Sequence, residues 1–280
     1  MSAERPDPPD PYVPPASSAP RKTILDVAPI SLLHWLSQAW GDMRAHPGIS
    51  SFYGLAFWIM AVVLGAVFQS KPEYTMSIAS GCLLLGPFLA MGLYEVSRRR
   101  ALGIQPDLAS SLTCWDTHIP SMGMLVLVLI VLELLWGRAS LVVFAVFFNT
   151  AMPSTAGVIQ AVFNPDNWEF LIAYTFIGGA FAALVFSIAV VSIPMILDRD
   201  TDAVFAAITS LEVVFQNTGT MICWGGIITG LVFLALLTPW ALGLLLVGPL
   251  LGHASWHAYR GLVQWPEEAG APTPALPPQA

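Results

Sequence analysis

The most prominent pattern along this chain is a series of long apolar segments separated by short polar ones. Six segments are apolar over 17 residues or more: 51–68, 74–97, 120–136, 168–197, 219–237 and 240–259. A membrane-spanning helix needs about 20 mostly apolar residues, and only helices and closed barrels satisfy their backbone hydrogen bonds in hydrocarbon. Barrel strands alternate apolar and polar positions, whereas these segments do not. The pattern therefore predicts an all-α, polytopic membrane protein with six transmembrane helices.

A shorter amphipathic segment precedes each pair of apolar segments. In residues 31–45 the apolar positions recur at helical spacing. The same holds for residues 201–216, where Asp202 can cap the helix, and more weakly for residues 107–115. Such helices are typical of the membrane interface. We therefore expect three units, each a cytoplasmic interfacial helix followed by a transmembrane hairpin.

The first and last hairpins share a motif that indicates an internal repeat. Residues 81–89 read GCLLLGPFL, and residues 243–251 read GLLLVGPLL. In this register Glu95 corresponds to His257. We therefore predict repeat units within a transmembrane domain. The units cover about 30–98, 107–197 and 202–260, and the domain covers 29–264.

The two ends of the chain differ from this domain in composition. Residues 1–28 are rich in proline, serine and aspartate, and residues 265–280 are rich in proline. Segments of this composition cannot bury a core, so we predict disordered tails. The start of the chain has no apolar stretch of the kind found in a cleaved secretory signal.

Charge and cysteine content narrow the class of protein further. Only 10% of the residues are charged, against about 25% in soluble domains. No basic stripe exists, so we expect the lipid bilayer and other membrane proteins as partners, and no nucleic acid. The three cysteines show no paired spacing, which argues against a disulfide framework.

The distribution of cations predicts the orientation in the membrane. With a cytoplasmic N-terminus and six crossings, Lys71 and Arg138 are the two cations at the outer side, and the other nine of the eleven lie inside. Positive residues favour the cytoplasmic side. We therefore expect both termini in the cytoplasm.

Glu133 and Arg138 are the charged residues closest to the hydrocarbon. If the third transmembrane helix begins near Pro120, Glu133 lies ~20 Å deep at a rise of 1.5 Å per residue. A carboxylate there needs a partner or a wet cavity. Arg138 is poorly placed on the same helix to be that partner, and it can extend to the outer headgroups instead. Glu133 is thus a candidate ion or proton site, or a structural polar contact.

His253 and His257 are spaced four residues apart and share one face of the last helix. This spacing suits metal or haem ligation, but two ligands are a weak signal and no further cluster accompanies them. Hydrogen-bonded packing is the alternative interpretation.

Helix-breaking residues mark three of the apolar segments. Gly86-Pro87 and Gly248-Pro249 occupy matching repeat positions, and Pro194 lies within the fourth segment. Proline frees a carbonyl and kinks a helix. Transporters use broken helices at their substrate sites, although Gly and Pro are common in membrane helices generally.

Two further features concern single segments. Glu95 is three and four residues before Arg98 and Arg99, which predicts an ion-paired cluster at the inner boundary. Residues 140–148 are almost purely apolar but too short to span. They form a re-entrant piece, an interfacial helix or the end of a long helix.

Four stretches together resemble a family of bacterial integral membrane proteins. They read SQAWGDMRAHPGISSFYG, LLLGPFLAMGLYEVSRRR, SIPMILDRDTDAVFAAITS and LGHASWHAYR. The resemblance covers about residues 30–262. The family is known as a domain of unknown function, and some relatives are labelled putative cytochrome c oxidase subunits. The resemblance implies a bacterial inner-membrane protein of uncharacterised role and carries over no functional residues.

Three hypotheses about function follow from these features. The first is a non-enzymatic accessory, assembly or scaffold component without a cofactor. The second is a small transporter or channel that uses the Gly-Pro helices and Glu133. The third is a haem- or metal-binding respiratory accessory that uses His253 and His257.

Overall fold

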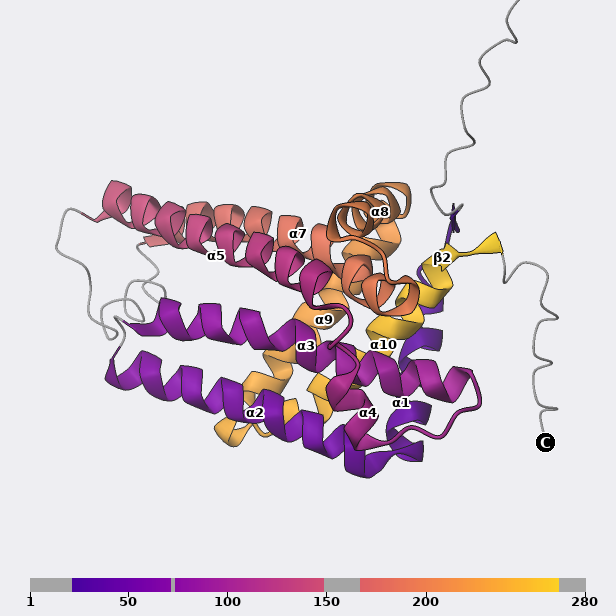
Figure 1. Ribbon diagram of the computed structural model, residues 1–280. Helices are drawn as coiled ribbons and strands as arrows, with labels where there is room; N and C mark the ends of the chain where they lie inside the picture. The colour runs from indigo at the N-terminus through magenta and orange to yellow at the C-terminus, as the bar shows by residue number, and fades with distance from the viewer. Residues whose placement is uncertain (1–21, 72–73, 149–166, 267–280) are drawn as a thin grey trace, which may run out of the picture.

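Helices make up almost all of the fold in the computed structural model, which describes residues 22–71, 74–148 and 167–266 (Figure 1). The long helices are α2 (Pro47–Ser70), α3 (Thr75–Ala101), α5 (Ile119–Phe147), α7 (Trp168–Arg199), α9 (Thr218–Leu237) and α10 (Leu244–Leu262). The shorter elements are β1 (Thr23–Ile24), α1 (Ser31–Ala45), α4 (Leu108–Thr113), α8 (Ala203–Gln216), the 3-10 turn η3 (Pro239–Ala241) and β2 (Val263–Gln264). The all-α prediction is confirmed.

Five of the described helices are long and apolar enough to cross a membrane, namely α2, α3, α5, α7 and α9. The helix α10 does not meet the same standard, because its second half carries His253, His257 and Arg260. The count of six crossings therefore stays a prediction. Residues 140–147 continue α5 without a break, so of the three interpretations of this stretch, the structure has the end of a long helix.

The order of elements is a short helix followed by two long ones, three times in succession. Each short helix packs on the second long helix of another unit: α4 on α3, α8 on α7, and α1 on α10. The helices α3, α7 and α10 also pack on one another. The three predicted repeat units and the duplication of the sequence stay predictions.

The short helices and both strands gather at one end of the long helices (Figure 1). We call this end, which carries Arg98, Arg99 and Arg100, the arginine end, and the rest of the long helices the distal half. At the arginine end, residues 91–97 of α3 and 191–197 of α7 are buried without interruption. The core of the molecule therefore lies at this end.

The large apolar residues Val204, Ile208 and Phe215 of α8 face outward rather than toward the core. The small and polar residues Ala206, Thr209 and Ser210 of this helix are fully buried, whereas Val204 and Phe215 are exposed. This arrangement suits a helix that lies against lipid headgroups and acyl chains with one face and against α7 with the other.

The three predicted helix-breaking prolines all lie within helices that continue past them: Pro87 in α3, Pro194 in α7 and Pro249 in α10. Proline removes one backbone hydrogen bond and leaves a carbonyl four residues earlier without its donor. In α10 that carbonyl is Leu245, and it faces Gly54 of α2, where an added Cβ would come within 2.2 Å of the oxygen. Pro249 and Gly54 thus allow α2 and α10 to approach closely.

The two strands tie the start of the described chain to its end. Thr23 pairs with Gln264, and Ile24 pairs with Val263, in antiparallel register. Asn217 holds the same N-terminal segment by accepting from Val27 N at 2.8 Å. Since β1 precedes and β2 follows all the candidate spans, their pairing favours an even number of crossings. The predicted tails at 1–28 and 265–280 fall mostly outside the described residues, but residues 22–28 and 265–266 belong to the folded part.

Candidate functional site

A buried polar network joins α1, α2, α3 and α10 at the arginine end. Asp42 lies on α1, Ser50 on α2, Ser97 on α3, and His253 and His257 on α10. The first four of these residues are at most 4% exposed. Buried polar groups require hydrogen-bond partners, and each of the five side chains finds its partner within this group.

The hydrogen bonds of the network run in one direction, toward Asp42. Ser97 Oγ donates its proton to Asp42 Oδ2 at 2.5 Å, so its oxygen must accept from His253 Nδ1, 2.7 Å away. The other nitrogen, His253 Nε2, is then left to accept from Ser50 Oγ at 3.1 Å. His257 Nε2 lies 2.8 Å from the same Oδ2. The arrangement is that of a carboxylate surrounded by donors.

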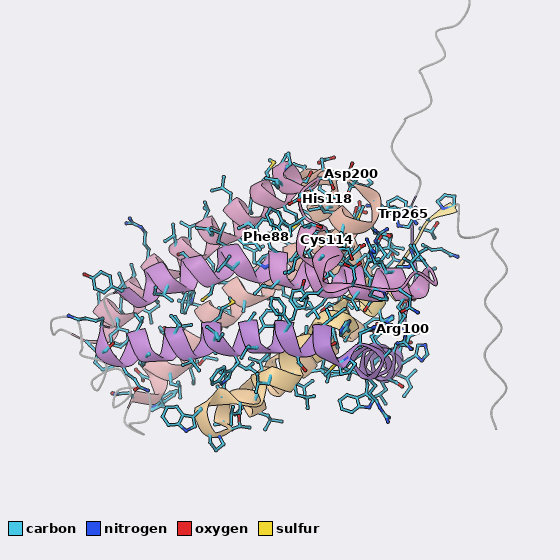
Figure 2. All side chains as sticks on the ribbon, turned by 60° about the horizontal axis from the view of Figure 1, so that its bottom comes forward. Phe88, Arg100, Cys114, His118, Asp200 and Trp265 are labelled. Atoms are coloured by element: carbon cyan, nitrogen blue, oxygen red, sulfur yellow. The ribbon has the colours of Figure 1, made fainter. Side chains whose placement is uncertain are left out.

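Arg100 completes the set of donors by pairing with Asp42 Oδ1. Figure 2 shows Arg100 at the end of α3 beside α1. Burial is the largest single effect and raises the pKa of Asp42, but the hydrogen bonds from His257 and Ser97 and the nearby His257 and His253 together lower it by more, so the pKa lies below its ordinary value of 3.8. Asp42 is therefore ionised at neutral pH and acts as the anchor of the network.

The geometry differs from that of a hydrolytic triad and from that of a metal site. In a triad the histidine lies between the serine and the aspartate, whereas here Ser97 lies between Asp42 and His253. Both ring nitrogens of His253 face serine hydroxyls. Within the described residues, no group of three or more His, Cys, Asp or Glu side chains is arranged to hold a metal ion.

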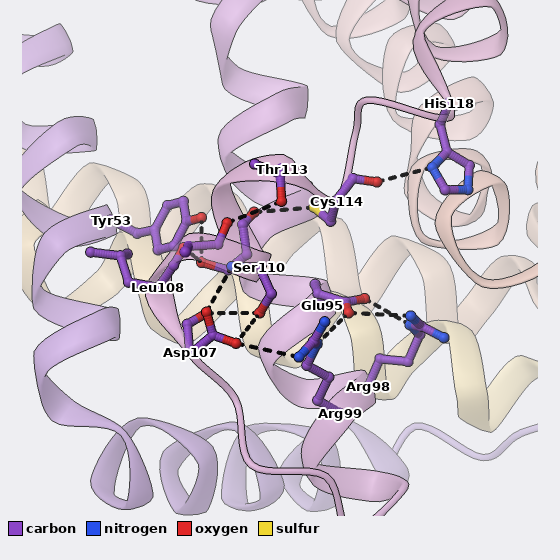
Figure 3. Close-up of polar contacts among 12 residues, drawn as sticks. Tyr53, Glu95, Arg98, Arg99, Asp107, Leu108, Ser110, Thr113, Cys114 and His118 are labelled. Carbon is purple, nitrogen blue, oxygen red and sulfur yellow. Dashed lines mark hydrogen bonds and ion pairs between the residues drawn. The ribbon is translucent and has the colours of Figure 1, made fainter.

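A second polar cluster connects α3 to the start of α4 (Figure 3). Glu95 accepts from Arg98 Nε at 2.8 Å and from Arg99 Nε at 2.7 Å. Arg99 also reaches Asp107, at 3.4 Å. Asp107 is the N-cap of α4 and accepts from Ser110 N at 2.9 Å. The predicted pairing of Glu95 with both arginines is thus present, and it extends to the interfacial helix.

Cys114 lies at the end of α4, beside the second cluster (Figure 3). Burial raises the pKa of its thiol to about 12. A thiol is nucleophilic only when it is deprotonated, so Cys114 stays unreactive at neutral pH.

Glu133 lies in the distal half, on α5, facing α3. Ser80 Oγ donates to Glu133 Oε2 at 2.7 Å. The other oxygen, Oε1, is buried and has no hydrogen-bond partner among the described residues. Arg138 is exposed, and no ion pair joins it to Glu133 in the described part of the chain. The structure thus gives Glu133 one partner, on a neighbouring helix.

The sequence predicted Glu95, His253, His257 and Glu133 as candidates but missed the side chains that organise them. Asp42 occupies a polar position on an amphipathic helix, and Ser50, Ser97 and Arg100 lie in stretches that carry the family resemblance but, like Ser80, show no pattern of their own that points to a role. One feature of the sequence could have identified Asp42 as a candidate, because it is the one acidic residue of 31–45.

The helices, their apolar surfaces and the polar network together define a polytopic α-helical integral membrane protein. Residues 75–198 match a family described as predicted integral membrane protein, DUF2189. The predicted resemblance to an uncharacterised membrane protein family is therefore confirmed over this segment, without support for the cytochrome c oxidase label. No curated protein and no solved structure matches the chain.

Proposed function

We propose that this protein is a non-enzymatic component of a bacterial inner membrane, with an accessory, assembly or scaffold role. The observation that supports this most is the network around Asp42. Its side chains come from four helices and bind one another, and Ser50, Ser97 and His253 are shielded from solvent. A network of this kind holds helices in fixed positions, and its buried hydroxyl and imidazole groups on Ser50, Ser97 and His253 are not accessible to a substrate.

The apolar perimeter supports a role in contacts within the membrane. Leu127 and Val146 on α5 are 60% and 72% exposed, and Ile222 and Leu237 on α9 are 70% and 66% exposed. Large exposed apolar surfaces mark contacts with lipid or with another protein. Helices of partner membrane proteins are therefore the partners that we propose.

The strand pairing and the arginines support a topology with both ends in the cytoplasm. Paired strands lie on the same side of the bilayer, so β1 and β2 favour six crossings, with α10 as the sixth. Arg98, Arg99 and Arg100 lie at that same end, and positive residues favour the cytoplasmic side. Reporter fusions after residue 280 and before residue 1 test this directly. Activity of a cytoplasmic reporter at both ends is expected, and a periplasmic signal at either end contradicts the topology.

Purification in mild detergent tests the accessory role. The tagged chain is expressed at a low level and isolated with its bound proteins, which are quantified by mass spectrometry. We expect one or more membrane proteins in a fixed ratio to the chain, retained at increasing salt because apolar contacts do not weaken with ionic strength. A chain that is recovered alone in several detergents contradicts the proposal. A Soret band or stoichiometric metal in the same sample would instead favour the redox hypothesis for His253 and His257.

A second candidate function is proton or cation transport through Glu133. One observation favours it: Glu133 Oε1 is a buried acceptor without a partner in the described residues, and carboxylates inside membranes often mark ion pathways. The test is a flux assay in proteoliposomes with Glu133→Gln. Glu169→Gln, which changes an exposed carboxylate in the first turn of α7, is the matched control. Flux that is lost in the first variant and kept in the second would replace the accessory role.

A further inference from the structure

An apolar pocket of about 380 Å³ lies between α2, α3 and α4, apart from the network around Asp42. The helix α3 contributes Leu84, Leu85 and Phe88 to its wall, and Leu112 and Trp115 form the opposite side. Phe88 and Trp115 are in edge-to-face contact, with ring centroids 5.7 Å apart. Ligand pockets are typically about 300–1,000 Å³ in volume and mostly apolar, so the size and the lining fit a small hydrophobic ligand.

The hydroxyl groups of the pocket are already used within the protein. Tyr53 donates from its hydroxyl to Ser111 Oγ at 3.0 Å, and Ser111 donates to Leu108 O at 2.9 Å. A ligand therefore finds apolar surface and no hydroxyl that needs a partner. The contacts also hold α4 in place against α2, so the pocket exists before a ligand arrives. Gly92 allows this close fit, because an added Cβ would lie 2.0 Å from the Tyr53 hydroxyl.

The pocket lies at the depth of one lipid leaflet. Phe88 is ten residues before Arg98 on α3, which corresponds to ~15 Å at 1.5 Å per residue, about half of the ~30 Å hydrocarbon core. Leu84 and Leu85 are 48% and 55% exposed, so the pocket opens sideways into lipid. Figure 2 shows Phe88 on α3, farther from the arginine end than Cys114.

Toward the arginine end, an ion-paired cluster of two arginines and two carboxylates follows the pocket along α3 and α4. Arg99 bridges Glu95 and Asp107, the N-cap of the helix that forms one wall (Figure 3). The side chains of Arg98 and Arg99 remain 32% and 28% exposed. Guanidinium groups at this level are suited to hydrogen-bond phosphate oxygens.

We propose that this pocket is a specific lipid site, which binds one acyl chain of a phospholipid while the phosphate lies at Arg98 and Arg99. Three observations carry the assignment: the apolar lining without free hydroxyls, the lateral opening in one leaflet, and the partly exposed guanidinium groups one chain-length away. The site goes beyond the proposed accessory role, which does not require it. Its test measures neither ion flux nor bound proteins.

Photo-crosslinking in bilayers tests the site. The full chain is reconstituted in vesicles of phosphatidylcholine and phosphatidylglycerol that contain a phospholipid with a diazirine in one acyl chain. After irradiation, adducts are mapped by digestion and mass spectrometry. We expect them to concentrate on residues 84–89 and 108–115. Leu112→Trp fills the pocket and should lower the adducts on 84–89 by about tenfold, because close-packed sites exclude added volume. Leu127→Trp, on the exposed face of α5, should leave them unchanged.

Three results overturn the proposal. The first is labelling that is spread evenly over all exposed apolar helices. The second is unchanged labelling in Leu112→Trp, with Leu85→Trp on the opposite wall used if the first variant is not monodisperse. The third is equal labelling by a diazirine fatty acid that competes fully with the phospholipid, which would assign the pocket to free fatty acids.

Discussion

The same long helices run through the arginine end and the distal half, but different contacts hold them together in the two regions. At the arginine end, residues 91–97 and 191–197 are buried and polar side chains connect four helices. In the distal half, Leu84 on α3 and Phe176 on α7 are 48% and 77% exposed, and among the described residues Glu133 has a single hydrogen bond, from Ser80.

This difference indicates where the stability of the molecule lies. In a bilayer, lipid tails solvate apolar side chains as well as neighbouring helices do, so helix association depends on close packing and hydrogen bonds. Both are concentrated at the arginine end. We therefore expect substitutions there to cost stability, and matched substitutions in the distal half to cost little.

The largest effect is expected for Asp42→Asn. The carboxamide removes the charge that Arg100 pairs with, and it presents an N–H group to donors. Breaking a buried ion pair costs about 3–5 kcal/mol; because the Arg100 side chain is 42% exposed, we expect a loss of about 2–3 kcal/mol in the free energy of unfolding. Unfolding in mixed micelles measures it. Asp26→Asn, at an exposed carboxylate, is the control, and equal stability of both variants would refute the anchoring role of Asp42.

A pair of glycine substitutions within α2 comes next. Gly54→Ala places a methyl group 2.2 Å from the Leu245 carbonyl oxygen, so α2 and α10 must separate, at a cost of about 1–3 kcal/mol. Gly65→Ala, on the same helix in the distal half, meets nothing within 4 Å. Alanine is the better helix former by up to about 1 kcal/mol, so the unfolding temperature should stay or rise. A loss of similar size in both variants would remove the distinction between the two ends.

A smaller effect is expected from acidification. The folded pKa of Asp42 is lower than its ordinary value of 3.8, so the network contributes its full stability above that pH and loses it as the pH falls through the folded pKa. Unfolding midpoints from pH 7 to pH 3 should therefore decline at the acidic end. The decline should be shallower in Asp42→Asn, and parallel curves would show that other carboxylates cause it.

The smallest effect on stability is expected for Glu133→Gln. The amide oxygen can still accept from Ser80, so the free energy of unfolding should change by less than about 1 kcal/mol. The same micelle assay measures it. A loss comparable to that of Asp42→Asn would mean that Glu133 holds helices together as firmly as the network does.

Much of the fold could be predicted from the sequence because the signal is local. The amphipathic segment predicted over 31–45 is α1, and Asp202 caps α8 by accepting from Val204 N at 2.9 Å. The continuation of α5 through residues 140–147 could have been predicted as well, because no glycine or proline interrupts the chain between Gly137 and the end of this helix.

The network could not be predicted, because its members are far apart in the chain. Asp42 meets Ser97 across 55 positions and His257 across 215. Helical spacing predicts which residues share a face, but not which face meets which. Their spacing predicts that His253 and His257 share a face of α10. Their partners follow only from the packing of α1, α2 and α3 against α10.

The pairing of Thr23 with Gln264 has a consequence for how the protein is made. The first strand emerges from the ribosome long before the last, so it waits without its partner while every intervening helix enters the bilayer. The strands β1 and β2 can pair only after synthesis has passed residue 264. A chain that ends before that point lacks this strand pairing. The pairing therefore distinguishes a chain that extends past residue 264 from a truncated one.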